Sequence, residues 1–172
     1  MDRHPGGEAH TRYLIRLSKL PPGSRWLDFG AGDGGSVRIL RKLGFEAFGL
    51  DLSPRGPDVT EGNFLHTGFE RSSFDGILSQ CAITLCGNPT EAFREAYRLL
   101  RAGGKLVFSD VCFDVPQMLE ELKNTGFSVL HTEDLTAQWK EYYLEALWKE
   151  EAVPSLPKGR HCSYVLLVCE RM

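Results

Sequence analysis

The chain of 172 residues is 42% hydrophobic and 25% charged, a composition typical of one globular domain and unlike disordered, collagen-like or coiled-coil chains. Its 20 Lys and Arg against 23 Asp and Glu give a formal charge of −3, which argues against a general nucleic-acid-binding face. No stretch is apolar for long enough to span a membrane, and we expect no signal peptide.

The cysteines indicate the compartment. Five of them, an odd number, together with the expected lack of a signal peptide, predict free thiols and a reducing, cytoplasmic location. No two form a C-x-x-C pair, and the histidines do not cluster with carboxylates at ligand spacing. We therefore expect no metal site.

Strands and helices alternate along the first half of the chain. In chain order, the expected elements are a helix at 8–19, a strand at 25–29, a helix at 36–43, a strand at 46–50, a weak strand within 59–65 and a strand at 74–79. The turn residues Pro21-Pro22-Gly23 end the first helix, and Gly44 ends the second.

The alternation continues in the second half. The expected elements are a helix starting at Asn88, a strand at 105–110, a helix between Asp114 and Gly126, a strand at 127–131, a helix at 135–150 and a strand at 163–170. Asn88 followed by Pro89 is a typical helix start, and Gly103-Gly104 is expected to stop that helix. The whole pattern favours one α/β domain over residues 1–172, with a mainly parallel sheet and a ligand at the carboxyl ends of its strands.

A glycine turn carries the functional signal. The segment 26–35 reads as strand, glycines and helix start, so that a ligand can approach the backbone without meeting a Cβ atom. Asp51 follows Gly30 by 21 residues, at the end of the next strand, where a carboxylate can accept hydrogen bonds from ribose hydroxyls. Gly30, Gly32 and Gly35 also fit the dinucleotide pattern G-x-G-x-x-G.

Two carboxylates help to distinguish between the possible cofactors. Asp28 precedes the first glycine and Asp33 lies within the turn, and both would repel a pyrophosphate. Negative charge instead favours the ammonium and sulfonium groups of S-adenosylmethionine. The residues therefore favour S-adenosylmethionine over NAD, with an NAD-dependent oxidoreductase as the alternative.

Four segments together resemble the class I S-adenosylmethionine-dependent methyltransferases, in the methyltransferase type 11 and ubiquinone/menaquinone-type branch. They are residues 27–34, 49–53, 69–78 and 92–106, and the tract 79–85 is in addition similar to arsenite methyltransferases. The resemblance implies a Rossmann-like α/β fold, with a seven-stranded, mostly parallel sheet, helices on both faces and an antiparallel last strand. It also implies S-adenosyl-L-methionine as methyl donor and S-adenosyl-L-homocysteine as product.

The resemblance further implies a role for each matching residue. Asp28 would hold the methionine amino end and Asp51 the ribose, while Leu52, Asn63 and the backbone of Phe64 would contact the adenine. The full set of expected cofactor-binding residues is Asp28, Gly30, Ala31, Gly32, Asp51, Leu52, Asn63, Phe64, Gln80, Cys81 and Tyr13. In this set, Gln80 and Cys81 belong at the methionine end near the methyl group, and Tyr13 at the cofactor carboxylate.

One departure from the family concerns the adenine side. Only 23 residues separate Asp51 from Asp75, and the Pro- and Gly-rich segment 53–57 cannot form much helix. Asn63 also stands where many members of the family have an acid. We expect a more open adenine side and weaker cofactor binding.

Residues for the methyl acceptor are less clearly marked. The N-terminal segment 1–24 is expected to lie over the cofactor site, where His4 or His10 is a candidate base, with a solvated histidine as the alternative. Asp110 ends a strand at the ligand edge and is a third candidate, or else a helix cap. The aromatic residues Trp139, Tyr142 and Tyr143 form either core or the wall of an acceptor pocket.

The expected function is methyl transfer to a small-molecule acceptor, which the sequence does not identify. Without an inserted cap domain, a small or partly exposed acceptor is favoured, and a partner protein is a further possible acceptor. The alternative is a catalytically weak or partner-dependent cofactor-binding subunit of a complex.

Overall fold

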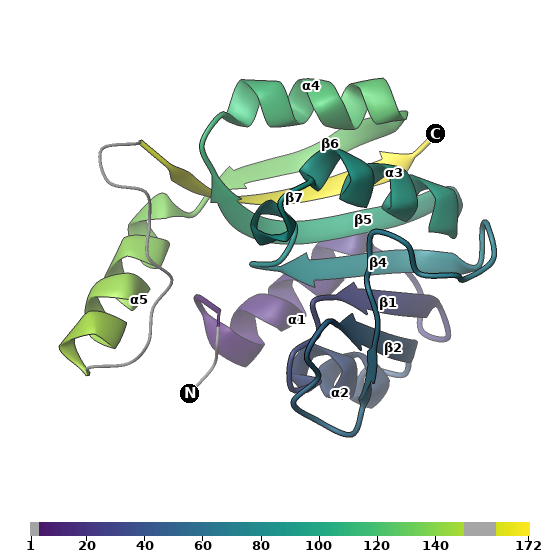
Figure 1. Ribbon diagram of the computed structural model, residues 1–172, viewed down its shortest axis with the longest axis horizontal. Helices are drawn as coiled ribbons and strands as arrows, with labels where there is room; N and C mark the ends of the chain where they lie inside the picture. Colours follow the sequence, from purple (N-terminus) through teal and green to yellow (C-terminus); the bar gives the residue numbers. More distant parts are fainter. Residues whose placement is uncertain (1–3, 150–160) are drawn as a thin grey trace.

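The computed structural model describes residues 4–149 and 161–172, which form a single seven-stranded sheet flanked by helices (Figure 1). The strand order is β3-β2-β1-β4-β5-β7-β6. The strands are β1 (Arg25–Phe29), β2 (Glu46–Asp51), β3 (Val59–Glu61), β4 (Phe74–Gln80), β5 (Leu100–Cys112), β6 (Phe127–Asp134) and β7 (Ser163–Arg171). The first five are parallel, and β7 lies antiparallel between β5 and β6. The expected sheet with an antiparallel last strand is confirmed.

Helices cover both faces of the sheet, each over its own hydrophobic cluster. They are α1 (Gly7–Ser18), α2 (Gly35–Lys42), α3 (Pro89–Leu99), α4 (Val115–Thr125) and α5 (Thr136–Trp148), with a short 3-10 turn η1 (Thr84–Cys86). Residues of α1, α2 and α5 share one cluster, whose members include Leu14, Val37 and Trp139. Residues of α3 and α4 share the other, with Phe93 and Leu122. None of the described helices is long and apolar enough to cross a membrane.

Local signals account for the predicted helix boundaries. The Asn88 side chain accepts a hydrogen bond from the backbone N–H of Glu91 at 3.2 Å, as an N-cap residue does. Asp114 caps α4 in the same way, and Gly126, with φ of 111°, ends it in the left-handed region that favours glycine. These predictions are confirmed.

Other boundaries differ from expectation. The weak strand within 59–65 is only Val59–Glu61, because the neighbouring β2 ends at Asp51, opposite Glu61. The double glycine does not separate α3 from the next strand: the helix already ends at Leu99, and β5 starts at Leu100 and contains both glycines. The register of β4 against β5 shifts between Phe74 and Gly76, at the level of these glycines. The predicted helix end at residue 150 lies outside the described residues.

The strand order marks a ligand position. From β1 the chain proceeds outward to β2 and β3, whereas from β4 it proceeds the opposite way to β5. In open parallel sheets, ligands bind at the carboxyl ends of the two strands where the order reverses. Here that position lies beyond Phe29 of β1 and Gln80 of β4.

Candidate functional site

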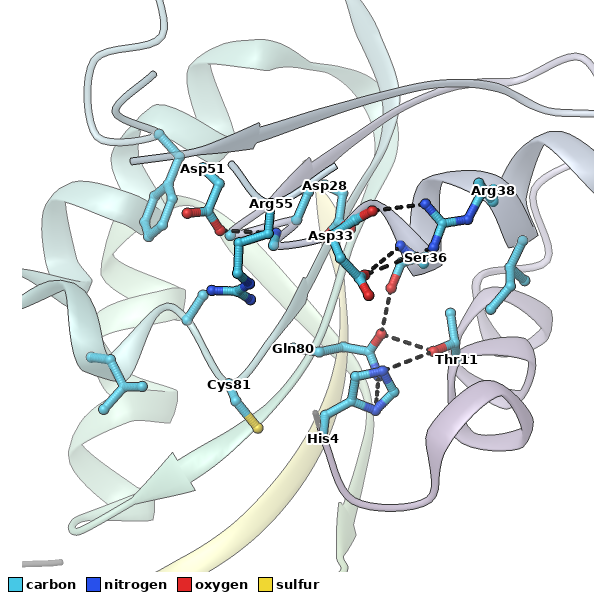
Figure 2. A pocket seen from close by; sticks show the side chains of 18 of the residues that line it. His4, Thr11, Asp28, Asp33, Ser36, Arg38, Asp51, Arg55, Gln80 and Cys81 are labelled. Atoms are coloured by element: carbon cyan, nitrogen blue, oxygen red, sulfur yellow. Dashed lines mark hydrogen bonds and ion pairs between the residues drawn. The ribbon is translucent and has the colours of Figure 1, made fainter. Parts of the chain in front are cut away.

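A cavity of about 540 Å³ opens at this position, a volume within the usual range of small-molecule sites (Figure 2). Its walls come from the loops after β1, β2 and β4, together with parts of α1 and α2. Ten residues predicted from the sequence to serve cofactor or acceptor line it: His4, Asp28, Gly30, Ala31, Gly32, Asp51, Leu52, Phe64, Gln80 and Cys81.

The glycine turn after β1 has its amides already engaged. Gly30 and Gly32 adopt φ values of 78° and 57°, in the left-handed region. The N–H groups of Gly30 and Ala31 both donate to the carbonyl of Leu50 at 2.9 Å, and the N–H of Gly32 donates to Oδ2 of Asp51 at 2.8 Å. The turn is thereby fixed to the end of β2.

The N–H groups of Gly34 and Gly35, at the start of the helix that follows, are engaged as well. The N–H of Gly34 donates to the carbonyl of Ala31, and that of Gly35 donates to Oδ1 of Asp33. A pyrophosphate at a dinucleotide-binding turn needs such N–H groups free. These engaged amides leave a pyrophosphate without the N–H groups of Gly30, Gly32 and Gly35, which disfavours NAD as the ligand.

Asp28 is a buried acid that faces the cavity. Its side chain, in β1, is 3% exposed and lines the cavity, and its carboxylate has no partner within the described part of the chain. Burial, and then the nearby charge of Asp51, raise the pKa of Asp28 to about 7. A buried carboxylate facing a cavity is stabilised by a cationic ligand group, such as the ammonium of a methionine moiety.

Asp51 is held in place by two backbone amides. Oδ2 accepts from Gly32 N–H at 2.8 Å, and Oδ1 accepts from Ser53 N–H at 2.9 Å. Each carboxylate oxygen keeps further acceptor capacity, as two adjacent ribose hydroxyls require. Next to it, the exposed Leu52 provides an apolar surface at the cavity rim.

Gln80 connects the N-terminal helix to the helix after the glycine turn. Its Oε1 accepts from Thr11 Oγ1 at 3.0 Å and from Ser36 Oγ at 3.1 Å, and its Nε2 lies 3.2 Å from Nδ1 of His4. Figure 2 shows this cluster converging at the end of β4. Thr11 and Ser36 were not predicted, because no local pattern in either helix distinguishes them from ordinary surface hydroxyls.

The segment after Asp51 forms no helix, as its Pro- and Gly-rich sequence predicts. It folds back over the glycine turn, where the N–H of Arg55 donates to the carbonyl of Gly32 at 2.9 Å. Gly56 packs so closely that a Cβ there would lie 2.2 Å from the carbonyl oxygen of Asp33. Asp58 then pairs with Arg41 at 2.6 Å. The turn and the segment therefore support one another.

The Arg55 side chain is the unexpected member of the cavity. A Cβ on Gly32 would lie 2.6 Å from Nη2 of Arg55, so the guanidinium covers the glycine. It reaches between Asp51 and Cys81 in the view of Figure 2. The guanidinium has no hydrogen-bond or ion-pair partner among residues 4–149 and 161–172. Sequence reasoning missed it because an arginine in a Pro- and Gly-rich loop gives no indication of its direction.

Four predicted residues lie elsewhere. The hydroxyl of Tyr13 donates to Glu133 at 2.9 Å, which directs it away from the expected position at the cofactor carboxylate. Asn63 does not line the cavity: its Oδ1 accepts from the N–H of Leu65.

The buried Asp110 accepts hydrogen bonds from the backbone and hydroxyl of Thr84, which orders the 3-10 turn η1. Burial raises the pKa of Asp110 to about 6 in spite of these bonds. The alternative role of Asp110 as a cap fits this contact better than that of a base. His10 lies beside a second, smaller cavity, described below.

Comparison with known proteins adds independent findings. Residues 3–165 match a family model described as a methyltransferase domain. The sarcosine/dimethylglycine N-methyltransferase of Aphanothece halophytica is 32% identical over an alignment of 117 positions that covers 58% of this chain and 42% of that protein. The phosphoethanolamine N-methyltransferase 1 of Zea mays is 27% identical over an alignment of 189 positions that covers 84% of this chain and 35% of that protein.

A solved structure has the same fold. Phosphoethanolamine N-methyltransferase 2 of Haemonchus contortus, in complex with S-adenosyl-L-methionine, superposes with a TM-score of 0.80 at 20% identity. The superposition covers 98% of this chain and 53% of that one. The chain thus spans about half the length, or less, of these three proteins.

Proposed function

The chain belongs to the class I S-adenosylmethionine-dependent methyltransferases, and from this premise we propose that it transfers a methyl group from S-adenosylmethionine to a small molecule by in-line displacement. The observation that carries the proposal is the pair of carboxylates in the cavity, the unpartnered Asp28 and the amide-held Asp51. The bond from sulfur to the methyl group breaks as the bond from the acceptor to the methyl group forms, and the neutral thioether leaves.

The residues of the cavity fit this cofactor. Asp51 would hold the ribose hydroxyls, and Asp28 the methionine ammonium, so that the sulfonium lies between two carboxylates. The wall residue Asp33 adds a third negative charge. The cofactor supplies an activated methyl group, and the protein contributes position and electrostatic support for its positive charges. Gln80 and Cys81, at the end of β4, would face the methionine end and the methyl group.

The relatives indicate the breadth of possible acceptors. Their printed names include sarcosine and dimethylglycine, phosphoethanolamine and arsenite. We propose a small molecule as the acceptor of this chain as well. Neither the base nor the acceptor atom follows from the cavity, and an acceptor that binds with its lone pair free needs no base.

The alternative, a weak or partner-dependent cofactor-binding subunit, is supported by one observation. The Arg55 guanidinium stands inside the cavity, where a positive charge disfavours a cationic cofactor. The two proposals differ in whether the isolated chain binds the cofactor on its own.

Titration calorimetry of the purified chain with S-adenosylmethionine, S-adenosylhomocysteine and NAD tests the proposal. We expect binding of the first two ligands in the micromolar range and none of NAD. Binding of NAD alone would refute the methyltransferase assignment. No binding of any of the three would favour the partner-dependent alternative.

A further inference from the structure

A second cavity, of about 110 Å³, lies between the N-terminal segment, α5 and β7. Its lining residues are Pro5, Gly6, His10, Leu135, Gln138, Trp139 and Tyr164. None of these carries a formal charge except His10 when protonated. Two buried aromatic rings form much of its wall: Trp139 is 8% exposed and stacks on Tyr164, 1% exposed, with ring centroids 6.3 Å apart and planes 7° from parallel.

This small cavity is a neighbour of the cofactor cavity. Cys81 lines the larger cavity, and its Sγ lies 3.4 Å from the hydroxyl of Tyr164, which lines the smaller one. In the same way, the ring of His4 in the larger cavity is 6.4 Å from the ring of His10 in the smaller. One layer of side chains therefore separates the two spaces, on the side of Gln80 and Cys81.

The polar atoms of the dividing wall are already paired. The hydroxyl of Tyr164 donates to Ser109 Oγ at 3.0 Å, and Nε2 of His10 lies 3.0 Å from the same oxygen. Burial, followed by the charge on His4, lowers the pKa of His10 to about 4, against the opposing effect of Glu133. Near pH 7 the wall is thus uncharged and has its hydrogen bonds satisfied.

These properties select a class of ligand. A carboxylate or phosphate placed here would lose its water and find no cation among the lining residues, which is costly. An uncharged group gains instead from contact with Trp139, Leu135 and Tyr164. The volume is below the roughly 150 Å³ that encloses a benzene ring, so the cavity takes a branched alkyl group, or the inner part of one small ring whose outer part stays outside it.

We propose that this cavity is the acceptor subsite, an inference that rests on the proposed function. The acceptor is a small molecule that places an uncharged ring or branched hydrocarbon group against Trp139 and Tyr164. The reacting atom then projects past the dividing wall toward Cys81 and the methyl group. Such an acceptor differs in kind from sarcosine and phosphoethanolamine, the compounds in the printed names of the relatives, which carry a carboxylate or a phosphate.

The test uses phenol as an uncharged probe and benzoate as an anion of similar size. Binding of each to the protein saturated with S-adenosylhomocysteine is followed by ligand-observed NMR, and that of S-adenosylhomocysteine itself by calorimetry. We expect phenol to bind at least tenfold more tightly than benzoate. Trp139→Ala should weaken phenol binding at least tenfold, whereas Trp148→Ala, at a 90% exposed position on the same helix, should change it less than twofold.

Because Trp139 belongs to the core, a second variant keeps the test decisive if Trp139→Ala fails to fold. Gln138→Phe covers the cavity from an exposed rim position, and Lys140→Phe, also exposed on α5, is its control. Only the former should abolish phenol binding. Equal binding of phenol and benzoate, or phenol binding that survives both Trp139→Ala and Gln138→Phe, would overturn the subsite. Failure of S-adenosylhomocysteine to bind would count against the proposed function. The phenol titration of the protein without S-adenosylhomocysteine would still show whether the small cavity binds an uncharged ring.

Discussion

Asp28 and Asp51 lie on neighbouring parallel strands and line the same cavity, yet Asp51 is held by two backbone amides while Asp28 has no hydrogen-bond partner within the described residues. The two acids therefore differ in what they need. The Asp51 carboxylate is already positioned to accept hydrogen bonds from hydroxyl groups. The buried Asp28 instead lacks a positive counter-charge, which a ligand can bring. The pair distinguishes the two ends of an elongated cationic ligand.

Asp28→Asn is expected to stabilise the empty protein at neutral pH and to weaken S-adenosylmethionine binding. Burial and the Asp51 charge raise the pKa of Asp28 from 3.8 to about 7, so folding takes up a proton between these values. The contribution of this carboxyl to stability is therefore complete below pH 3.8 and is lost as the pH rises through 7. At pH 8 the variant should gain on the order of 2–4 kcal/mol in the free energy of unfolding, as measured by urea titration.

The control for this prediction is Asp33→Asn, at an exposed position of the same cavity, which should bring no comparable gain in the free energy of unfolding at pH 8. If the stability of wild type and Asp28→Asn falls with the same slope between pH 5 and 8, Asp28 is not the titrating group.

Asp51→Ala should weaken binding of S-adenosylhomocysteine by at least about 30-fold, since two hydrogen bonds to a charged acceptor are lost. It should also lower the melting temperature, because the N–H of Gly32 loses its acceptor. Ser53→Ala is the matched control, because Ser53 serves Asp51 through its backbone N–H and not through its side chain. Unchanged affinity in a folded Asp51→Ala protein would place the ribose elsewhere.

Arg55→Ala is expected to tighten S-adenosylmethionine binding several-fold at low salt. The guanidinium occupies cavity space over Gly32 and adds a positive charge where the cofactor brings its own. Arg55→Gln removes the charge and keeps most of the volume, so calorimetry on both variants separates repulsion from steric blocking. Weaker binding in both would instead make Arg55 a ligand of the cofactor carboxylate.

Glu95→Gln should lower the free energy of unfolding at pH 7 by about 1–3 kcal/mol. The Glu95 side chain is 9% exposed, accepts from Thr67 N–H and Oγ1 at 3.0 and 2.7 Å, and pairs with Arg98 at 2.7 Å. These contacts hold the loop that carries Phe64 into the cavity wall.

The pH dependence of this variant is also defined. Burial acts to raise the pKa of Glu95, but the hydrogen bonds from Arg98 and Thr67 outweigh burial, and the pKa is lowered from 4.5. The stabilisation is therefore present above pH 4.5 and is lost as the pH falls through the lowered pKa, where wild type and variant should converge. Glu91→Gln, one turn earlier and with a longer 3.4 Å pair to Arg94, is the control and should change stability by less than about 0.5 kcal/mol.

The sequence by itself determined the alternation of strands and helices, the capped starts of α3 and α4, and the glycine turn followed by Asp51. These features depend on neighbouring residues: hydrophobic spacing, a side chain that reaches an N–H three residues on, and glycines that accept positive φ. The positions of Asp28, Asp51 and Gln80 at one edge follow as well, because parallel strands bring their carboxyl ends together.

Only the tertiary structure decided which distant side chains meet. The hydroxyl of Tyr13 donates to Glu133, 120 positions away in the sequence, and the ring of His10 contacts Ser109, 99 positions away. Neither Tyr13 nor His10 faces the cofactor cavity. The short segment after Asp51 could be recognised as unable to form a helix, but not as a loop that lays Arg55 across the glycine turn. The small cavity likewise requires the N-terminal segment, α5 and β7 at once. Side-chain direction and the space left between elements depend on packing of the whole core, which no local pattern encodes.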